Sequence, residues 1–324
     1  MKRTFSGVQP TNNLHIGNYF GAIKNWVDLQ SSHECIYCVV DLHALTVYQK
    51  PEVLRSNIIN VVKTYLALGV DPKKSIIFQQ SDVSAHAELG WVLNTIAKVS
   101  EIERMTQYKD KAAQHAQNIN MGLMDYPVLM AGDILLYDTA VVPVGKDQKQ
   151  HVELARDLSE RFNKLYGDTF VVPAPLIKKE GCRIMGLDDA GKKMSKSAPS
   201  PANYIALLDD PAVAKKKIMR AVTDSGTEVK SGTDKPALTN LLTIYSLLVG
   251  KSIKELEKQY TGKGYGDFKN DLADVVADFL ADFQQKFNKI SDADVKEILR
   301  SGADKARVIA DKKISQVKKA VGII

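Results

Sequence analysis

The first forty-five residues alternate between segments typical of strands and of helices, and this alternation constrains the fold more than any other feature. Residues 4–7 are extended, and residues 9–13 carry turn-forming Pro and Asn. Residues 17–30 place apolar side chains at helical spacing, and residues 36–40 form a second apolar run. A strand–helix–strand of this length predicts a right-handed βαβ unit, which opens a parallel sheet.

The rest of the chain continues the alternation and then becomes helical. The pattern predicts a helix over 51–69, a strand over 75–79, helices within 84–137, a strand over 140–145 and a helix over 147–166. Residues 173–200 are predicted to be rich in loops, and residues 223–237 to be a surface linker. Apolar stripes over 275–287 and 298–317 predict the core of a helical bundle.

Composition is that of an ordinary globular protein, with 44% hydrophobic residues and a formal charge of +6. This mild charge permits a polyanionic partner without requiring one. We expect a cytoplasmic location, because no apolar run is long enough for a membrane span or a signal core. Cys35 and Cys38 lie in a predicted buried strand, which places them on opposite faces as core residues of a protein in a reducing compartment.

Two short strings carry the chemistry. His15-Ile16-Gly17-Asn18 follows the first strand, where parallel sheets hold ligands and where helix N–H groups favour anions. Lys193-Met194-Ser195-Lys196-Ser197 offers ammonium groups that can stabilise phosphoryl oxygens. Dinucleotide and P-loop fingerprints are absent. From these residues alone, an ordinary strand–helix turn and a solvated basic loop remain alternatives to a site that holds a triphosphate.

Both strings resemble motifs of the class I aminoacyl-tRNA synthetases. Residues 15–18 are a variant of the family's His-Ile-Gly-His element, and residues 193–197 match its Lys-Met-Ser-Lys-Ser loop. The resemblance extends to bacterial tryptophanyl-tRNA synthetases over nearly the whole chain. It is carried further by residues 5–10, 17–22, 40–44, 104–109, 126–137 and 144–151.

The resemblance implies a Rossmann-like parallel-sheet catalytic domain followed by an all-helical domain. We expect the catalytic domain over 1–185, the lysine loop and its connection over 186–205, and the helical domain, which contacts the tRNA anticodon, over 206–324. The implied reaction activates L-tryptophan with ATP, releases pyrophosphate, and transfers the tryptophanyl group to the 3′-terminal adenosine of tRNA(Trp). Mg²⁺ is expected on ATP, with no metal site of the protein's own and no organic cofactor. A homodimer and no membrane partner are expected.

The resemblance also assigns residues to each substrate. The residues expected to bind tryptophan are Asp133, which accepts the indole N–H, Tyr126 and Gln148 at the amino group, and Phe5, Val40, His43 and Met130 as walls. The residues expected to bind ATP are Gln9, Pro10, Thr11, His15, Gly17, Asn18, Gly145, Lys146, Asp147, Ile184, Lys193, Met194, Ser195, Lys196 and Ser197. The residues expected to take part in catalysis are Lys111, Lys193, Ser195 and Lys196.

The chain departs from the family pattern at a few positions. Asn18 replaces the last histidine of the class motif, and His15 supplies a first histidine that many bacterial relatives lack. Ala198 stands where relatives often carry aspartate, and Gly132 replaces a common alanine. The alternatives are a tyrosyl-tRNA synthetase, a non-catalytic paralogue and a cofactor-forming adenylyltransferase. The Tyr126–Asp133 string argues against the first, and the complete lysine loop against the second.

Overall fold

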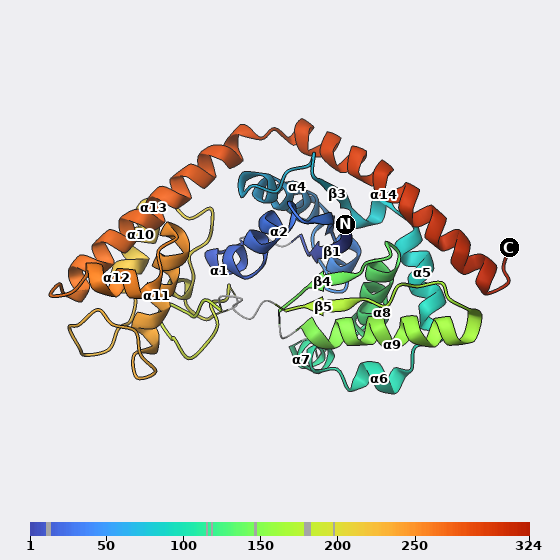
Figure 1. The fold of residues 1–324 in the computed structure, drawn as a ribbon, viewed down its shortest axis with the longest axis horizontal. Coiled ribbons are helices and arrows are strands. Elements are labelled where there is room, and N and C mark those ends of the chain that lie inside the picture. Colours follow the sequence, from blue (N-terminus) through green and yellow to red (C-terminus); the bar gives the residue numbers. More distant parts are fainter. Residues whose placement is uncertain (11–13, 115, 118, 146–147, 178–182, 197) are drawn as a thin grey trace. The chain divides into compact units, whose positions relative to one another are not determined.

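The computed structural model describes residues 1–10, 14–114, 116–117, 119–145, 148–177, 183–196 and 198–324 (Figure 1). The strands are β1 Lys2–Val8, β2 His33–Val39, β3 Ser75–Gln79, β4 Val141–Pro143 and β5 Ala174–Leu176. The α-helices up to the last strand are α1 Ile16–Asn18, α2 Lys24–Leu29, α3 Asp41–Ala44, α4 Pro51–Ala67, α5 Ala85–Asn94, α6 Val99–Glu103, α7 Thr106–Gln114, α8 Met121–Leu135 and α9 Lys149–Tyr166. The later α-helices are α10 Pro211–Arg220, α11 Pro236–Val249, α12 Ile253–Gln259, α13 Tyr265–Lys289 and α14 Asp292–Ala320. The π-helical segment is η1 Tyr19–Ile23, and the 3-10 segments are η2 Gln80–Asp82 and η4 Pro201–Asn203.

The strands form one parallel sheet in the order β3-β2-β1-β4-β5. This confirms the predicted Rossmann-like architecture. The chain first runs outward from β1 to β3 and then returns to the other side of β1 with β4. The crossover direction therefore reverses between β1 and β4. Ligands of open parallel sheets bind at the carboxyl ends of the strands beside such a reversal.

The last strand, β5, lies within the segment that the sequence predicts to be loop-rich. It pairs with β4 from Val141↔Ala174 to Pro143↔Leu176. The strand has only three residues, and Pro175 stands at its centre. Proline cannot donate to a ladder and is tolerated in an edge strand, which is the position of β5. Because the strand is short and contains proline, the sequence pattern does not predict it.

Two compact units make up the chain, and their limits differ from the predicted domains. The first unit contains residues 1–12, 25–179 and 291–324, and the second contains residues 13–24 and 180–290. The predicted boundaries at 185 and 206 therefore do not coincide with the units. Residues 223–237 contain no regular element before α11 begins at Pro236, and they lie inside the second unit rather than between units.

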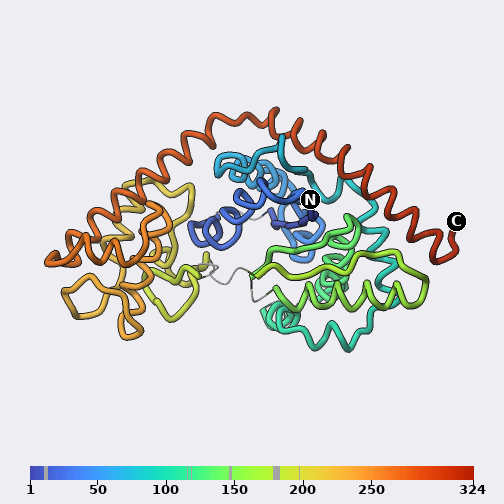
Figure 2. The backbone as a smooth tube through the Cα atoms, viewed as in Figure 1, coloured from blue at the N-terminus to red at the C-terminus, as the bar shows by residue number. Residues whose placement is uncertain are grey.

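The final helix, α14, belongs to the sheet-containing unit. In Figure 2 the red C-terminal helix runs beside segments from the first third of the chain, and its contacts are with β3, α4 and α5. Ala306, Ala310 and Val317 are buried in one core with Phe5 and Ile36 of the sheet. The stripe over 298–317 is therefore a sheet-covering face, and its prediction as the core of a helical bundle is wrong. A stripe indicates burial, but it does not identify the partner.

The stripe over 275–287 lies in the second unit, as a bundle core. Val276, Leu280 and Phe283 of α13 are buried, and α13 packs against α10 and α11. Cys35 and Cys38 are buried free thiols of β2 in the first unit, as their placement in an apolar strand predicts.

Gly302 determines how closely α14 can approach the sheet. A Cβ atom added at Gly302 would overlap the backbone carbonyl oxygen of Ile77 in β3, which no rotamer change can relieve. We therefore expect Gly302→Ala to lower the free energy of unfolding by about 1–3 kcal/mol, the range for overpacked interiors. Urea titration measures this loss. The matched control is Gly266→Ala in α13, where an added Cβ meets nothing within 4 Å. An equal effect of both substitutions would contradict this role of Gly302.

Candidate active site

Predicted site residues gather at the carboxyl ends of the central strands. Gln9 and Pro10 follow β1, Val40 follows β2, and Gly145 stands two residues after β4. These segments flank the crossover reversal between β1 and β4. Thr11, Lys146 and Asp147, also predicted to bind ATP, lie outside the described residues. The fold thus places parts of both predicted binding sets at the edge where a parallel sheet binds ligands.

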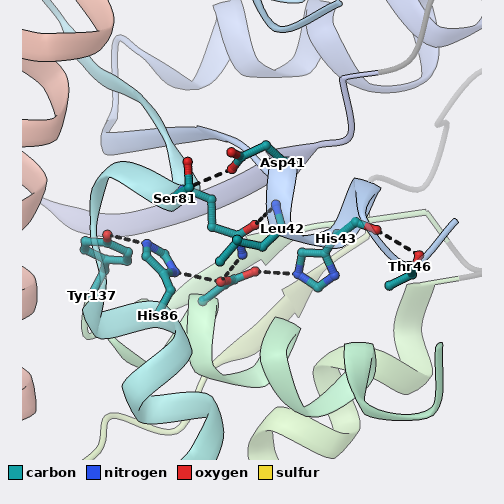
Figure 3. A network of polar contacts seen from close by, with 9 residues as sticks. Asp41, Leu42, His43, Thr46, Ser81, His86 and Tyr137 are labelled. Atoms are coloured by element: carbon teal, nitrogen blue, oxygen red, sulfur yellow. Dashed lines mark hydrogen bonds and ion pairs between the residues drawn. The ribbon is translucent and has the colours of Figure 1, made fainter. Parts of the chain in front are cut away.

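Asp133 of α8 is the centre of a buried polar network, and its partners His43 and His86 are labelled in Figure 3. Its Oδ2 lies 2.8 Å from Nε2 of His43, which α3 supplies. Its Oδ1 lies 2.6 Å from Nδ1 of His86 in α5 and accepts from Nε2 of Gln80 at 2.7 Å. All four residues are buried, with Asp133 only 1% exposed. Residues from separate elements therefore converge on one carboxylate.

Asp133 is a carboxylate and not a carboxylic acid. Burial alone would raise its pKa, but the hydrogen bonds from His43 and His86 outweigh burial and lower the pKa to about 2. An ionised carboxylate only accepts, so the facing nitrogens of both histidines donate. Three of its roughly four acceptor positions are used by protein donors. The position left on Oδ2 suits one further N–H donor.

The other residues predicted to bind tryptophan all lie in the same unit as Asp133. Phe5, Val40 and Tyr126 are buried, and Met130 is partly buried against the core. The rings of His43 and Tyr126 meet edge to face at 6.4 Å between centroids. Gln148 stands at the N-cap position of α9.

Gly7 in β1 leaves space for one of these predicted walls. A Cβ added at Gly7 would lie 2.8 Å from Cγ1 of Val40. Only glycine therefore lets Val40 take its place beside β1.

Lys111 is held within the sheet-containing unit. Its ammonium lies 4.0 Å from the centre of the Tyr126 ring, a cation–π contact. Burial lowers the pKa of Lys111. The structure therefore places Lys111, a predicted catalytic residue, against Tyr126, which is predicted to bind tryptophan.

His15 to Asn18 fold into a tight turn in the second unit. The backbone N–H of His15 donates to Oδ1 of Asn18 at 2.9 Å, so Asn18 caps the start of α1. A Cβ at Gly17 would lie 2.9 Å from Nδ1 of His15, so glycine is needed to seat the imidazole. The turn pairs with the segment after the lysine loop, through His15↔Ala206. His15, Gly17 and Asn18 thus each have a structural role within this turn.

The lysine loop is fixed at both ends within the same unit. Met185 pairs with Lys193, and the N–H of Met194 donates to the carbonyl of Ile184 at 3.0 Å. The side chains of Met194 and Ile184 are both buried. The N–H of Ser195 donates to Oδ1 of Asn203. The buried side chain of Met194 therefore anchors the loop, while the side chains of Lys193 and Lys196 are exposed. Ser197 lies outside the described residues.

His15 is neutral at neutral pH. Burial lowers its pKa to about 4, and the charge of Lys193 adds to this effect. The unfolded chain therefore binds more protons than the folded chain between pH 6.5 and about 4, and stability falls as the pH is lowered through this window. His15 contributes a slope of up to roughly 1.4 kcal/mol per pH unit. We expect His15→Asn to flatten the pH dependence measured by urea unfolding across this window, and an unchanged slope would contradict the burial.

Sequence reasoning missed Gln80 and His86, although both donate to Asp133. Gln80 directly follows β3, so the rule that ligands gather at the carboxyl ends of strands could have indicated it. His86 lies on the buried face of α5 next to Leu89 and Leu93. A histidine among apolar helix residues gives no sequence signal that separates a core residue from a functional one.

Gly132 has a packing environment that the sequence does not reveal. A Cβ added there would lie 3.4 Å from the backbone nitrogen of Gly90, an ordinary contact distance. Gly132 is therefore not required for the packing of α8 on α5, which brings Asp133 to His86.

The described residues contain no group of three His, Cys, Asp or Glu side chains placed to hold a metal ion. Among the helices that the structure describes, none is long and apolar enough to cross a bilayer.

A parallel sheet with polar residues at the carboxyl ends of its strands is typical of nucleotide-binding enzymes, and comparison with known proteins identifies the family of this chain. The model of the tRNA synthetases class I (W and Y) matches residues 1–281. The chain belongs to this family and is an aminoacyl-tRNA synthetase. It is 50% identical to a Tryptophan--tRNA ligase of Caldanaerobacter subterraneus subsp. tengcongensis over 325 residues, covering 100% of this chain and 99% of the relative. A Tryptophan--tRNA ligase of Bacillus anthracis is also 50% identical, with 98% of that relative covered.

Solved structures agree with the sequence comparison. The tryptophanyl-tRNA synthetase of Mycoplasma pneumoniae superposes with a TM-score of 0.92 at 37% identity, covering 99% of this chain and 98% of the other. That of Campylobacter jejuni, crystallised with ADP and tryptophan, has a TM-score of 0.86 at 39% identity and covers 99% of each chain. The resemblance to bacterial tryptophanyl-tRNA synthetases is thereby confirmed.

Proposed function

We propose that this chain is a tryptophan–tRNA ligase. It activates L-tryptophan with ATP to tryptophanyl-adenylate and then esterifies the 3′-terminal adenosine of tRNA(Trp). The observation that carries the amino-acid specificity is the ionised, buried Asp133, which keeps one acceptor position for an N–H donor. The indole ring presents such a donor, whereas the phenol of tyrosine presents a hydroxyl at a different place. The full-length relatives named as tryptophan–tRNA ligases support the same assignment.

The activation step needs no covalent enzyme intermediate. The tryptophan carboxylate attacks the α-phosphorus of ATP, the bond from this phosphorus to the β-phosphate bridging oxygen breaks, and pyrophosphate leaves. Lys193 and Lys196 are the proposed stabilisers of the charge that develops on the phosphates. Their exposure on an anchored loop lets them reach a bound nucleotide. Lys111 and the Ser195 hydroxyl are proposed to assist, with the remaining predicted ATP residues positioning the nucleotide.

Mg²⁺ is proposed to arrive bound to the phosphates of ATP, as part of the substrate. The lysine-rich loop fits such a substrate, because ammonium groups bind phosphoryl oxygens that the metal leaves uncovered. The homodimer, the cytoplasmic location and the anticodon contacts of the helical residues within 206–324 are proposed on the family resemblance. Exposed Tyr48 and Trp91 of the sheet-containing unit are candidates for apolar surface that a second copy would cover.

Charging of tRNA tests the proposal. The purified chain is incubated with ATP, bulk bacterial tRNA and each of tryptophan and tyrosine in labelled form. We expect acid-precipitable label with tryptophan alone. Activation of tryptophan without charging would indicate a paralogue that has lost tRNA transfer, and charging with tyrosine alone would overturn the assignment.

A further inference from the structure

His86 is fully buried between two hydrogen-bonding partners. Its Nδ1 lies 2.6 Å from Oδ1 of Asp133, and its Nε2 lies 2.8 Å from the hydroxyl of Tyr137 (Figure 3). His86 and Tyr137 are both 0% exposed. The Tyr137 ring also stacks on Phe5 at 5.6 Å between centroids. Tyr137 and His86 therefore connect Phe5, a predicted wall of the amino-acid site, to the carboxylate of Asp133.

The partners give this chain of hydrogen bonds a single direction. The ionised Asp133 can only accept, so Nδ1 of His86 carries the proton between them. In a neutral imidazole the other nitrogen, Nε2, is then an acceptor, and the Tyr137 hydroxyl donates to it. Burial raises the pKa of Tyr137, so the phenol keeps the proton that it donates. Tyr137 thereby supports the tautomer of His86 that Asp133 requires.

Gln80 gives Oδ1 a second donor of fixed direction. The backbone N–H of Leu42 donates to Oε1 of Gln80 at 3.1 Å. Because a peptide N–H cannot accept, the amide oxygen must face Leu42, and the amide nitrogen faces Asp133. His86 and Gln80 therefore saturate Oδ1, and the remaining acceptor position of Asp133 lies on Oδ2 beside His43.

We propose that His86, held in place by Tyr137, is a positioning residue that keeps Asp133 an obligate hydrogen-bond acceptor and so restricts the amino-acid site to aromatic rings bearing an N–H donor. This inference rests on the proposed role of Asp133 in binding tryptophan. Without the Tyr137 hydroxyl, Nε2 of His86 loses its hydrogen-bonding partner, and the imidazole is held less firmly in the orientation in which Nδ1 donates to Asp133.

Other titratable groups surround this network and must be separated from it. They are His43 from α3, Cys38 from β2, Asp125 from α8 and Asp311 from α14. These groups can alter the absolute rate with either of two amino acids. The ratio of kcat/KM for two amino acids, measured in the same enzyme sample, is independent of the fraction of active enzyme. It also cancels effects that are common to both.

The test compares tryptophan with 3-benzothienyl-alanine, in which sulfur replaces the indole N–H. A site built around an N–H acceptor should prefer tryptophan by at least about 10³ in kcat/KM. We expect Tyr137→Phe to lower this preference by up to about tenfold, the upper end of the range for one hydrogen bond between neutral groups. We also expect the preference of the unaltered protein to stay constant between pH 7 and 5, because Asp133 stays ionised over this range.

The matched control is Tyr37→Phe. Tyr37 is also 0% exposed, and its hydroxyl donates to the carbonyl of Trp26 at 2.8 Å. The substitution therefore removes a buried hydrogen bond that does not involve Asp133. It should leave the preference unchanged at every pH. At His86 itself, His86→Asn supplies an amide donor near the position of Nδ1, so it should retain more of the preference than His86→Leu, which supplies none.

Asp133→Asn separates the possible outcomes. If Asp133→Asn abolishes the preference while Tyr137→Phe and His86→Leu retain it at all pH values, the role of His86 is overturned and the role of Asp133 stands. If Asp133→Asn also retains the preference, the proposed binding of the indole N–H by Asp133 fails. A loss of preference in Tyr37→Phe equal to that in Tyr137→Phe would mean a general packing effect and would also overturn the inference.

Discussion

Asp133→Ala is expected to lower kcat/KM for tryptophan by about 10²–10³ in the activation reaction. The substitution removes the carboxylate that we propose receives the indole N–H, and a hydrogen bond to a charged group contributes roughly 1.5–3 kcal/mol. It also leaves the donors of His43, Gln80 and His86 without their shared partner, in a site that is 1% exposed at its centre. KM for ATP should stay within about threefold, because the proposed ATP ligands are other residues.

Pyrophosphate exchange at varied tryptophan and ATP concentrations measures both effects of Asp133→Ala. The control is Glu101→Ala, which removes a carboxylate that pairs with Arg161 at 2.6 Å in the same unit. Melting curves of both variants report any loss of folding. An unchanged kcat/KM for tryptophan in Asp133→Ala would refute the assignment of this residue to the amino-acid site.

Lys196→Ala should lower kcat for adenylate formation by about 10²-fold and leave the Kd of tryptophan nearly unchanged. The lysine is proposed to meet charge that is greatest in the transition state, and removal of such an interaction lowers kcat rather than ground-state binding. The loop itself should keep its place, because Met194 is buried and its N–H is bound by Ile184. The substitution therefore removes charge without removing the anchor.

Single-turnover kinetics and tryptophan titration separate rate from affinity in this variant. Lys192→Ala is the matched control, since Lys192 is an exposed lysine of the same loop that pairs with Asp189 at 3.5 Å. It should change kcat less than about threefold. A weaker affinity for ATP with an unchanged kcat in Lys196→Ala would show that Lys196 serves binding and not the transition state.

The sequence predicts the sheet where strands are long and apolar. The runs that became β1, β2 and β3 are distinct from their surroundings, and the parallel order follows from the helices between them. β5 carries no such signal, because its three residues around Pro175 show no apolar pattern. The stripe of α14 predicts a buried face but not the partner of that face, because periodicity says nothing about which core receives it.

In the amino-acid site too, the sequence predicts single residues but not the partners that the fold brings to them. The resemblance over residues 126–137 assigns Asp133 to tryptophan. Its partners Gln80 and His86 come from distant segments, 53 and 47 positions away, and only the fold brings them to one carboxylate. The direction of their hydrogen bonds depends on Leu42 and Tyr137, which carry no such signal in the sequence.

Exchange of labelled pyrophosphate into ATP, with tryptophan and tyrosine compared in the same preparation, tests whether the chain activates tryptophan. We expect exchange that depends on tryptophan and is not stimulated by tyrosine at equal concentration. Exchange stimulated only by tyrosine, or no exchange with either amino acid from a folded protein, would contradict it.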